Sequence, residues 1–212
     1  MDRSNQINTF SRLTQVSRET ILSLIRYEEA LIKANKSLNL VGKSTIKDIW
    51  IRHFLDSAQV IDLIEKNDKK MIDLGSGAGF PGLVISLVAK DKKIPLKVKL
   101  IEKSPKKSKF LKEISESLSL NAEIVTKNAL KDQIDLSGQI IIARAFKPLK
   151  VVLELIHKKT ANFKKIFLFL GKTGQNELLL ASKIWDIQYK QRRSVTNSDS
   201  SIIEIDKIKK IN

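Results

Sequence analysis

A glycine-rich loop at residues 73–82 carries the clearest chemical signal in this sequence. Gly75, Gly77 and Gly79 alternate there with small residues, directly after a short apolar run. Glycines at the end of a strand let a ligand approach the backbone, and the free amides at the start of a following helix attract anionic groups. The loop therefore predicts a binding site for a nucleotide-like ligand.

The spacing within the loop separates two such ligands. In the NAD fingerprint a third glycine or alanine would occupy position 80, because strand–helix packing needs a small side chain there. This chain has Phe80 instead. Asp73, two residues before Gly75, matches the D-x-G-x-G-x-G loop of methyltransferases that use S-adenosylmethionine. The structural alternative is that Asp73 only ends a strand through a turn hydrogen bond.

A second acidic residue, Glu102, ends the apolar run at 97–101, about 20 residues after the glycine loop. The carboxyl ends of parallel strands meet at one sheet edge, so we expect Glu102 to lie beside the loop. A carboxylate there can accept hydrogen bonds from both hydroxyls of a ribose. A solvated surface charge is the alternative, and the spacing from the loop favours binding.

Positioning these residues requires a parallel sheet. From residue 70 onward, short apolar runs alternate with amphipathic stretches, which is typical of βαβ units and predicts an α/β, doubly wound sheet. The chain ends in two strand candidates without a long helix between them, which indicates an antiparallel hairpin. The predicted strands are 71–74, 97–101, 122–126, 139–143, 165–170, 184–190 and 202–205, and the predicted helices are 81–89, 105–120 and 148–158.

The first part of the chain has a different pattern. Apolar residues recur at helical spacing over 21–32 and again over 46–64, which predicts two amphipathic helices joined by a turn at 39–43. Ser44 and Thr45 are candidate N-caps of the second helix. We interpret residues 1–66 as a helical cap packed on the same domain, and residues 67–212 as the ligand-binding core.

Composition limits the class of protein. The 212 residues carry a formal net charge of +16, which favours a polyanionic partner such as RNA or DNA, although a general preference for lysine is the alternative. The absence of cysteine excludes disulfides, thiolate metal sites and a cysteine nucleophile. We expect no metal. The chain has no apolar run of about 18 residues, so we expect a cytoplasmic protein without a membrane span.

Several motifs stand out along the chain. They are Asn39-Leu40-Val41, Arg52-His53-Phe54-Leu55-Asp56-Ser57, Asp73 through Gly82, Lys106-Lys107 with Phe110-Leu111, and Arg144-Ala145-Phe146. Together, and in this order over about residues 20 to 180, they resemble the bacterial small-subunit ribosomal RNA methyltransferase family known as RsmG or GidB. The resemblance implies a Rossmann-like class I methyltransferase fold, in which a mostly parallel seven-stranded sheet follows an N-terminal helical extension. It also implies S-adenosylmethionine as cofactor and N7 methylation of one guanosine in 16S ribosomal RNA.

The resemblance also assigns site residues. The implied cofactor contacts are Gly75, Gly77, Gly79, Phe80, Glu102, Asn128, Ala129 and Arg144. Arg144 and His53 are the candidate catalytic residues, and only the resemblance nominates His53, because its position on an apolar stripe equally predicts a core histidine. The chain departs from the family in two places. It lacks the usual acidic residue in the stretch 128–130, and it has Gly171-Lys172 where Lys-Gly is common.

The implied chemistry agrees with the residues present. Guanine N7 carries a lone pair and no proton, so methyl transfer needs alignment and no general base. Without cysteine the covalent route to cytosine C5 is closed, and Arg144-Ala145-Phe146 stands where enzymes that methylate amino groups have D/N-P-P-Y/F. Arg144 could donate to guanine O6 or orient the methionine carboxylate of the cofactor.

Two other functions stay open. One is a methyltransferase fold that binds RNA or assists assembly without activity, and the other is a methyltransferase for a different RNA site. The lysines at 103, 106, 107 and 109 follow Glu102 and could hold RNA phosphates, or they could be a solvated helix face. We expect small-subunit ribosomal RNA or the ribosomal particle as partner, and a monomer.

Overall fold

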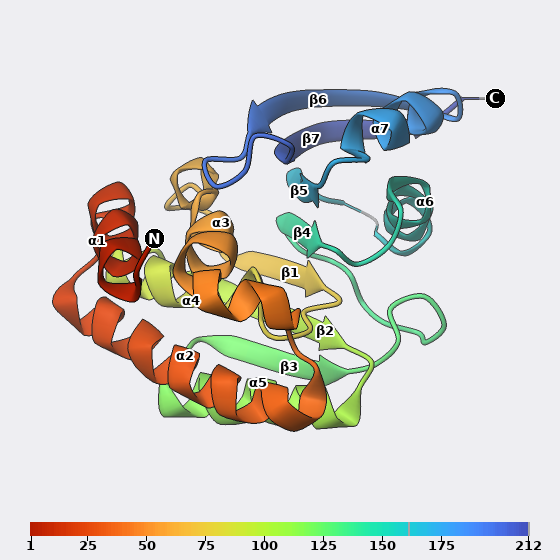
Figure 1. Cartoon of the computed structure of the whole chain (residues 1–212). Coiled ribbons are helices and arrows are strands. Elements are labelled where there is room, and N and C mark those ends of the chain that lie inside the picture. Colours follow the sequence, from red (N-terminus) through yellow and green to blue (C-terminus); the bar gives the residue numbers. More distant parts are fainter. Residues whose placement is uncertain (161, 212) are drawn as a thin grey trace.

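The computed structural model describes residues 1–160 and 162–211, in which seven strands form one sheet of order β3-β2-β1-β4-β5-β7-β6 (Figure 1). β1 to β5 are parallel, and β7 runs antiparallel to both of its neighbours. The predicted doubly wound sheet with a terminal hairpin is therefore confirmed. The strands are β1 (Lys70–Leu74), β2 (Lys97–Glu102), β3 (Ala122–Thr126), β4 (Ile140–Arg144), β5 (Lys165–Leu170), β6 (Trp185–Arg193) and β7 (Ser201–Lys210).

Helices cover both faces of the sheet, as the apolar character of its central strands requires. One hydrophobic cluster joins the first face to α4 (Gly82–Asp91), α5 (Pro105–Ser117) and the N-terminal helices. A second cluster joins the other face to α6 (Leu149–Lys159) and α7 (Gly174–Ser182). The sequence did not predict α7, because it is short and exposes Leu179 and Leu180.

The N-terminal helices only partly match the prediction. α2 (Arg18–Leu38) is regular and is capped by Ser17, whose hydroxyl accepts from the amide of Thr20. It is preceded by α1 (Arg3–Thr14), which the apolar pattern missed because two of its three buried residues are polar. The first 66 residues share one hydrophobic cluster with the sheet. The boundary between a helical cap, residues 1–66, and a ligand-binding core, residues 67–212, stays a prediction.

The single helix predicted over 46–64 is wrong. This segment consists of the 3-10 helix η1 (Lys43–Asp48), the π-helix η2 (Trp50–Leu55), the short α3 (Asp56–Ala58) and the 3-10 turn η3 (Ile61–Leu63). Four of the six residues of η2 are buried, more than one face of a regular α-helix would bury, and the wide π turn accommodates them. The predicted N-caps are also wrong, because Gly42 takes that position and the Thr45 hydroxyl donates to its carbonyl.

One hydrogen bond joins the N-terminal helices to the glycine loop. The hydroxyl of Tyr27, on α2, donates to the carbonyl of Ala78, and Tyr27 is fully buried. Gly79 makes room for this contact, since a Cβ there would lie 2.3 Å from the Tyr27 hydroxyl. The loop is thus held from outside the sheet.

This contact generates the first prediction. Replacing Tyr27 by Phe leaves the buried Ala78 carbonyl without its donor, which should lower the free energy of unfolding by about 1 to 3 kcal/mol. Denaturant unfolding measures the change. The chain's other tyrosine, Tyr189, is 43% exposed, so Tyr189→Phe is the matched control and should change stability by less than about 0.5 kcal/mol. Equal effects in the two variants would contradict the proposed anchoring of the loop.

Candidate functional site

The glycine loop turns sharply between β1 and α4. Gly75, Gly77 and Gly79 all have positive φ angles, of 73°, 58° and 94°. At Gly75 a side chain is also excluded by space, because a Cβ would lie 2.2 Å from the ring of Phe146. The amides of Gly75 and Ser76 donate to the carbonyl of Ile101, which ties the loop to the end of β2. Glycine is therefore required for both the turn and its packing.

Asp73 lies underneath this loop. Its Oδ2 atom accepts from the amide of Gly82 at 3.1 Å, so one carboxylate bridges the two ends of the loop. Asp73 is completely buried, and this burial raises its pKa from 3.8 to about 7, against the opposing effect of the Gly82 amide. Its Oδ1 atom has no hydrogen-bond partner among the described residues. Asp73 thus makes the turn hydrogen bond that is expected if its role is to end the strand.

Glu102 reaches the loop from the end of β2. Its Oε2 atom accepts from the amide of Gly77 at 3.0 Å, and its Oε1 atom accepts from the amide of Ser104 at 2.8 Å. The residue is 6% exposed, and what remains accessible faces a cavity. These two bonds fix the carboxylate while leaving lone pairs for a ligand hydroxyl.

The cavity beside Glu102 collects most of the predicted site residues. Its volume is about 590 Å³, within the range of small-molecule sites. Gly79 is not among the lining residues, so its contact with a cofactor stays a prediction. The predicted residues that line this first cavity are His53, Gly75, Gly77, Phe80, Glu102, Asn128, Ala129 and Arg144.

Asn128 and Ala129 form the far wall of the first cavity. The Asn128 side-chain oxygen accepts from the amide of Leu130 at 3.0 Å, and this turn fixes the backbone. The carboxylate of Asp132 accepts from the amide of Asn128 at 2.7 Å. The Asp132 carboxylate therefore binds the backbone, and Asp132 does not line the first cavity.

Phe80 belongs to an aromatic group between the loop and the N-terminal helices. The His53 ring stacks on Phe80, with centroids 5.0 Å apart and planes inclined by 14°. Tyr27 and Phe54 pack against the same ring at 5.7 and 5.8 Å. Phe80, which is too large for the NAD fingerprint, thus forms part of the contact between the glycine loop and the N-terminal helices.

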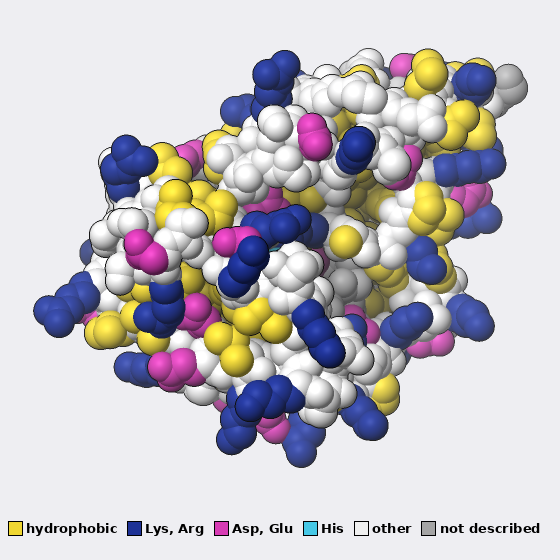
Figure 2. Space-filling model, viewed as in Figure 1, with side chains coloured by type: hydrophobic (Ala, Val, Ile, Leu, Met, Phe, Trp, Pro, Cys, Tyr) yellow, Lys and Arg dark blue, Asp and Glu magenta, His cyan; other side chains and the backbone are white. Residues whose placement is uncertain are grey.

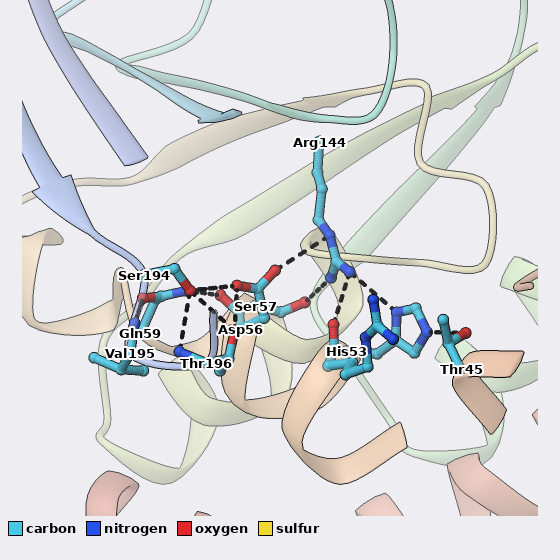
Figure 3. A network of polar contacts seen from close by, with 10 residues as sticks. Thr45, His53, Asp56, Ser57, Gln59, Arg144, Ser194, Val195 and Thr196 are labelled. Atoms are coloured by element: carbon cyan, nitrogen blue, oxygen red, sulfur yellow. Dashed lines mark hydrogen bonds and ion pairs between the residues drawn. The ribbon is translucent and has the colours of Figure 1, made fainter. Parts of the chain in front are cut away.

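Arg144 is the centre of a polar network that sequence reasoning did not foresee (Figure 3). It emerges from the end of β4 and contacts the N-terminal segment. Its Nη2 atom donates to the Arg52 carbonyl at 2.8 Å and to His53 Nδ1 at 3.1 Å. Its Nη1 atom donates to the Ser57 hydroxyl at 3.4 Å, and its Nε atom lies 3.3 Å from the Asp56 carboxylate. Three guanidinium N–H groups therefore donate hydrogen bonds within the protein, and the Asp56 carboxylate adds an ion pair.

The network determines the protonation state of His53. Because Arg144 can only donate, Nδ1 must accept, so the neutral ring carries its proton on Nε2. That N–H donates to the Thr45 hydroxyl at 2.8 Å, and Thr45 donates onward to the Gly42 carbonyl. Burial, together with the charges of Arg144 and Arg52, lowers the His53 pKa from 6.5 to about 3. His53 therefore stays neutral and orients Arg144.

Asp56 extends the network to the loop between β6 and β7. Its Oδ1 atom accepts from the hydroxyls of Ser194 and Thr196, both at 3.0 Å, and from the side-chain amide of Gln59 at 2.8 Å. Asp56 and Ser57 both belong to the motif at 52–57, which was noted only for its resemblance to a family. Its dense mixture of charged and apolar residues was the available signal for this role.

Lysines surround the first cavity. Lys103 and Lys107 line it, as do Lys127, Lys131 and Lys147, whereas Lys106 and Lys109 do not. Figure 2 shows lysine and arginine side chains scattered over the whole visible face rather than gathered into one patch. In the described residues, no helix is long and apolar enough to cross a membrane, and no group of three or more acidic or histidine side chains is arranged to hold a metal ion.

Solved structures share this architecture. A TehB-like S-adenosylmethionine-dependent methyltransferase from Corynebacterium glutamicum has a TM-score of 0.57 and 18% identity, covering 84% of this chain and 98% of that chain. TrmK of M. capricolum, in complex with S-adenosylhomocysteine, has a TM-score of 0.53 and 16% identity, covering 71% of this chain and 66% of that chain. The chain therefore has the fold of class I S-adenosylmethionine-dependent methyltransferases.

Sequence comparison narrows this class to one family. Residues 20–205 match the sequence model of GidB, described as rRNA small subunit methyltransferase G, and the chain belongs to that family. It is 38% identical to the ribosomal RNA small subunit methyltransferase G of Pelagibacter ubique over 199 residues, which are 93% of each chain. The resemblance stated from the motifs is confirmed.

The position of Glu102 generates a second prediction. Glu102→Ala should weaken binding of S-adenosylhomocysteine by about 1.5 to 3 kcal/mol, because hydrogen bonds to a charged acceptor are lost. Calorimetric titration measures the affinity. Glu113→Ala, on the exposed face of α5, is the matched control and should bind like the wild type. If Glu102→Ala also retains wild-type affinity, Glu102 does not contact the cofactor.

The buried neutral state of His53 generates a third prediction. Between pH 6.5 and about 3 the unfolded chain binds a proton that the folded chain does not, so His53 lowers the free energy of unfolding as the pH falls through this range. Chemical unfolding at several pH values should show a shallower acid decline for His53→Gln than for the wild type. His157→Gln controls for the loss of one histidine, since His157 lies outside the network. Identical pH profiles for wild type and His53→Gln would contradict the neutral assignment.

Proposed function

We propose that this chain transfers a methyl group from S-adenosylmethionine to N7 of a guanosine in small-subunit ribosomal RNA. One observation carries the proposal. In a chain matched to this family over residues 20–205, the glycine loop, Glu102 and Arg144 come from distant positions and line a single cavity. The cavity lies at the carboxyl ends of β1, β2 and β4, where ligands of open α/β sheets bind.

The cavity residues fit the cofactor. Glu102 would accept hydrogen bonds from the ribose hydroxyls, because its oxygens are fixed in place by the amides of Gly77 and Ser104. Gly75 and Gly77 would allow close approach to the methionine part. Asn128 and Ala129 would lie against the adenine. When bound, the cofactor supplies an electrophilic methyl group.

The surroundings of the reaction fit an acceptor that needs no deprotonation. His53 is neutral, and both of its ring nitrogens are used in hydrogen bonds within the protein. It is therefore not free to act as a general base. Guanine N7 has an available lone pair, so alignment of N7 with the methyl group is sufficient for transfer. Arg144 and His53 would serve to hold this geometry.

The partner is ribosomal RNA, free or in the small-subunit particle. A formal charge of +16 supports association with RNA phosphates, since neutralising them releases counterions. We further propose that the protein acts in the cytoplasm as a monomer. The alternatives, an inactive RNA-binding factor or an enzyme for another RNA site, have no specific observation in their favour.

The fourth prediction tests the reaction itself. The purified chain, incubated with labelled S-adenosylmethionine and small-subunit ribosomal RNA, should yield labelled 7-methylguanosine after nuclease digestion. Glu102→Ala should slow the reaction at subsaturating cofactor. Free RNA and intact small-subunit particles should be compared as substrates. A different labelled nucleoside would support the alternative enzyme, and no labelled product from either substrate would support the inactive factor.

A further inference from the structure

The turn at residues 128–132, which contributes the far wall of the first cavity, receives little support from the sheet. It follows β3, the outermost strand on that side, and among the described residues only β2 pairs with this strand. From 127 to 139 the chain then runs without a helix or strand until β4 begins. Long connections of this kind are commonly mobile unless other parts of the fold hold them. The turn therefore needs contacts from elsewhere.

Lys159, the last residue of α6, supplies such contacts. Its Nζ atom donates to the carbonyls of Ala129 at 2.8 Å and Asp132 at 2.7 Å, and more weakly to the carbonyl of Leu130 at 3.5 Å. An ammonium group has three N–H donors, and the turn provides three carbonyl acceptors for them. Because each peptide group is planar, fixing the direction of a carbonyl also fixes the amide on the same plane. One cation thus holds the backbone of the turn at three points.

The amides of the turn are also engaged, with one exception. Leu130 donates to the side-chain oxygen of Asn128, and the amides of Lys131 and Asp132 donate to the Asn128 carbonyl at 3.1 and 2.9 Å. The Ala129 amide finds no acceptor among the described residues, although Ala129 is only 3% exposed and lines the first cavity. Buried amides are nearly always paired, so this one points to an acceptor on a ligand.

The backbone of this turn is better suited to the adenine than its side chains are. Residues 128–130 contain no acid, and the Asn128 oxygen is already bonded to the Leu130 amide. With the ribose at Glu102, the edge of adenine that lies away from the ribose would face this wall. That edge carries the amino group and the ring nitrogen N1, which accepts a hydrogen bond. The Ala129 amide is a matching donor, and its direction depends on the shape of the turn.

We propose that Lys159 is a positioning residue for the cofactor, which holds the turn 128–132 in the conformation that presents the Ala129 amide to the adenine ring. This inference rests on the proposed function, which puts the adenine against Asn128 and Ala129. Lys159 itself does not line the first cavity, so it acts only through the turn. In this way α6 contributes to the cofactor site, although none of its residues lines that cavity.

Hydrogen exchange tests the effect of Lys159 on the turn without any ligand. Lys159→Met keeps most of the side-chain volume and removes the three donors. Exchange of the amides at 128–132 should accelerate on the order of tenfold, because the turn opens more readily without the charged hydrogen bonds. Lys90→Met is the matched control, since Lys90 donates to the carbonyls of Leu118 and Ser119 at 3.2 and 3.0 Å, outside the cavity. Unchanged exchange at 128–132 in Lys159→Met, or equal acceleration there in both variants, would overturn the proposal.

Ligand preference tests the contact with adenine. S-adenosylhomocysteine and S-inosylhomocysteine differ at one edge of the base, where the amino group and the acceptor N1 are replaced by a carbonyl and an N–H. In calorimetric titrations the wild type should prefer S-adenosylhomocysteine by about tenfold or more, and Lys159→Met should lose most of this preference. A general loss of stability would not change this ratio, so Lys90→Met should retain it. Lys159→Arg, which can still donate to the carbonyls, should recover much of it.

The outcomes separate this inference from the proposed function. The inference is overturned if Lys159→Met keeps the wild-type preference, or if the wild type has none. A wild type that binds neither compound overturns the inference together with the assigned cofactor. If the preference depends on Lys159 but the wild type makes no 7-methylguanosine, the inference holds and the proposed reaction fails. Thermal melting is the folding control, and Lys159→Gln, with a shorter side chain and fewer donors, replaces Lys159→Met if that variant does not fold.

Discussion

The ion pair and hydrogen bonds of one guanidinium connect the parts of this molecule that must act together. Arg144 stands at the end of β4, and its hydrogen bonds reach Arg52 and His53, which lie 92 and 91 positions earlier in the chain. The ion pair with Asp56 reaches the same segment. Asp56 in turn holds the loop after β6. Sheet, cap and C-terminal hairpin therefore share one partly buried charged group, and a displacement of any of them would remove some of the contacts of that group.

The energetics of burial explain why so many partners are present. Removing one member of a buried ion pair costs about 3 to 5 kcal/mol, because the remaining charge is left uncompensated in a poorly polarisable surrounding. Arg144 and Asp56 have side chains only 18% and 13% exposed. The neutral His53 supplies an acceptor without adding a second positive charge. The network thus keeps a cation at the end of β4 with three hydrogen-bond acceptors and one carboxylate around it.

How much of this could be read from the sequence depends on the range of the interaction concerned. The strands and the place of Glu102 were predictable, because apolar runs and glycine spacing are local signals and parallel strands share an edge. The irregular course of residues 43–63 was not, since the π turn of η2 arises from burial of Trp50 and Phe54 against the rest of the core. The contacts of Arg144 could also not be predicted, because no residue near it in the sequence indicates that His53 or Asp56 is its partner. A motif at 52–57 could be noted, but its partners lie on other elements.

The position of β6 at the outside of the sheet has a consequence for solubility. Within residues 1–160 and 162–211, no strand pairs with its outer side, and such edges can pair with other chains and start aggregation. The strand carries exposed Lys190, Arg192 and Arg193, and its register shifts between Gln188 and Tyr189. Like charges repel a second copy of the same edge, and the irregularity interrupts the straight ladder that it would need. In a lysine-rich protein, the positive charge that we propose to attract RNA phosphates would thus also oppose edge-to-edge pairing of two chains.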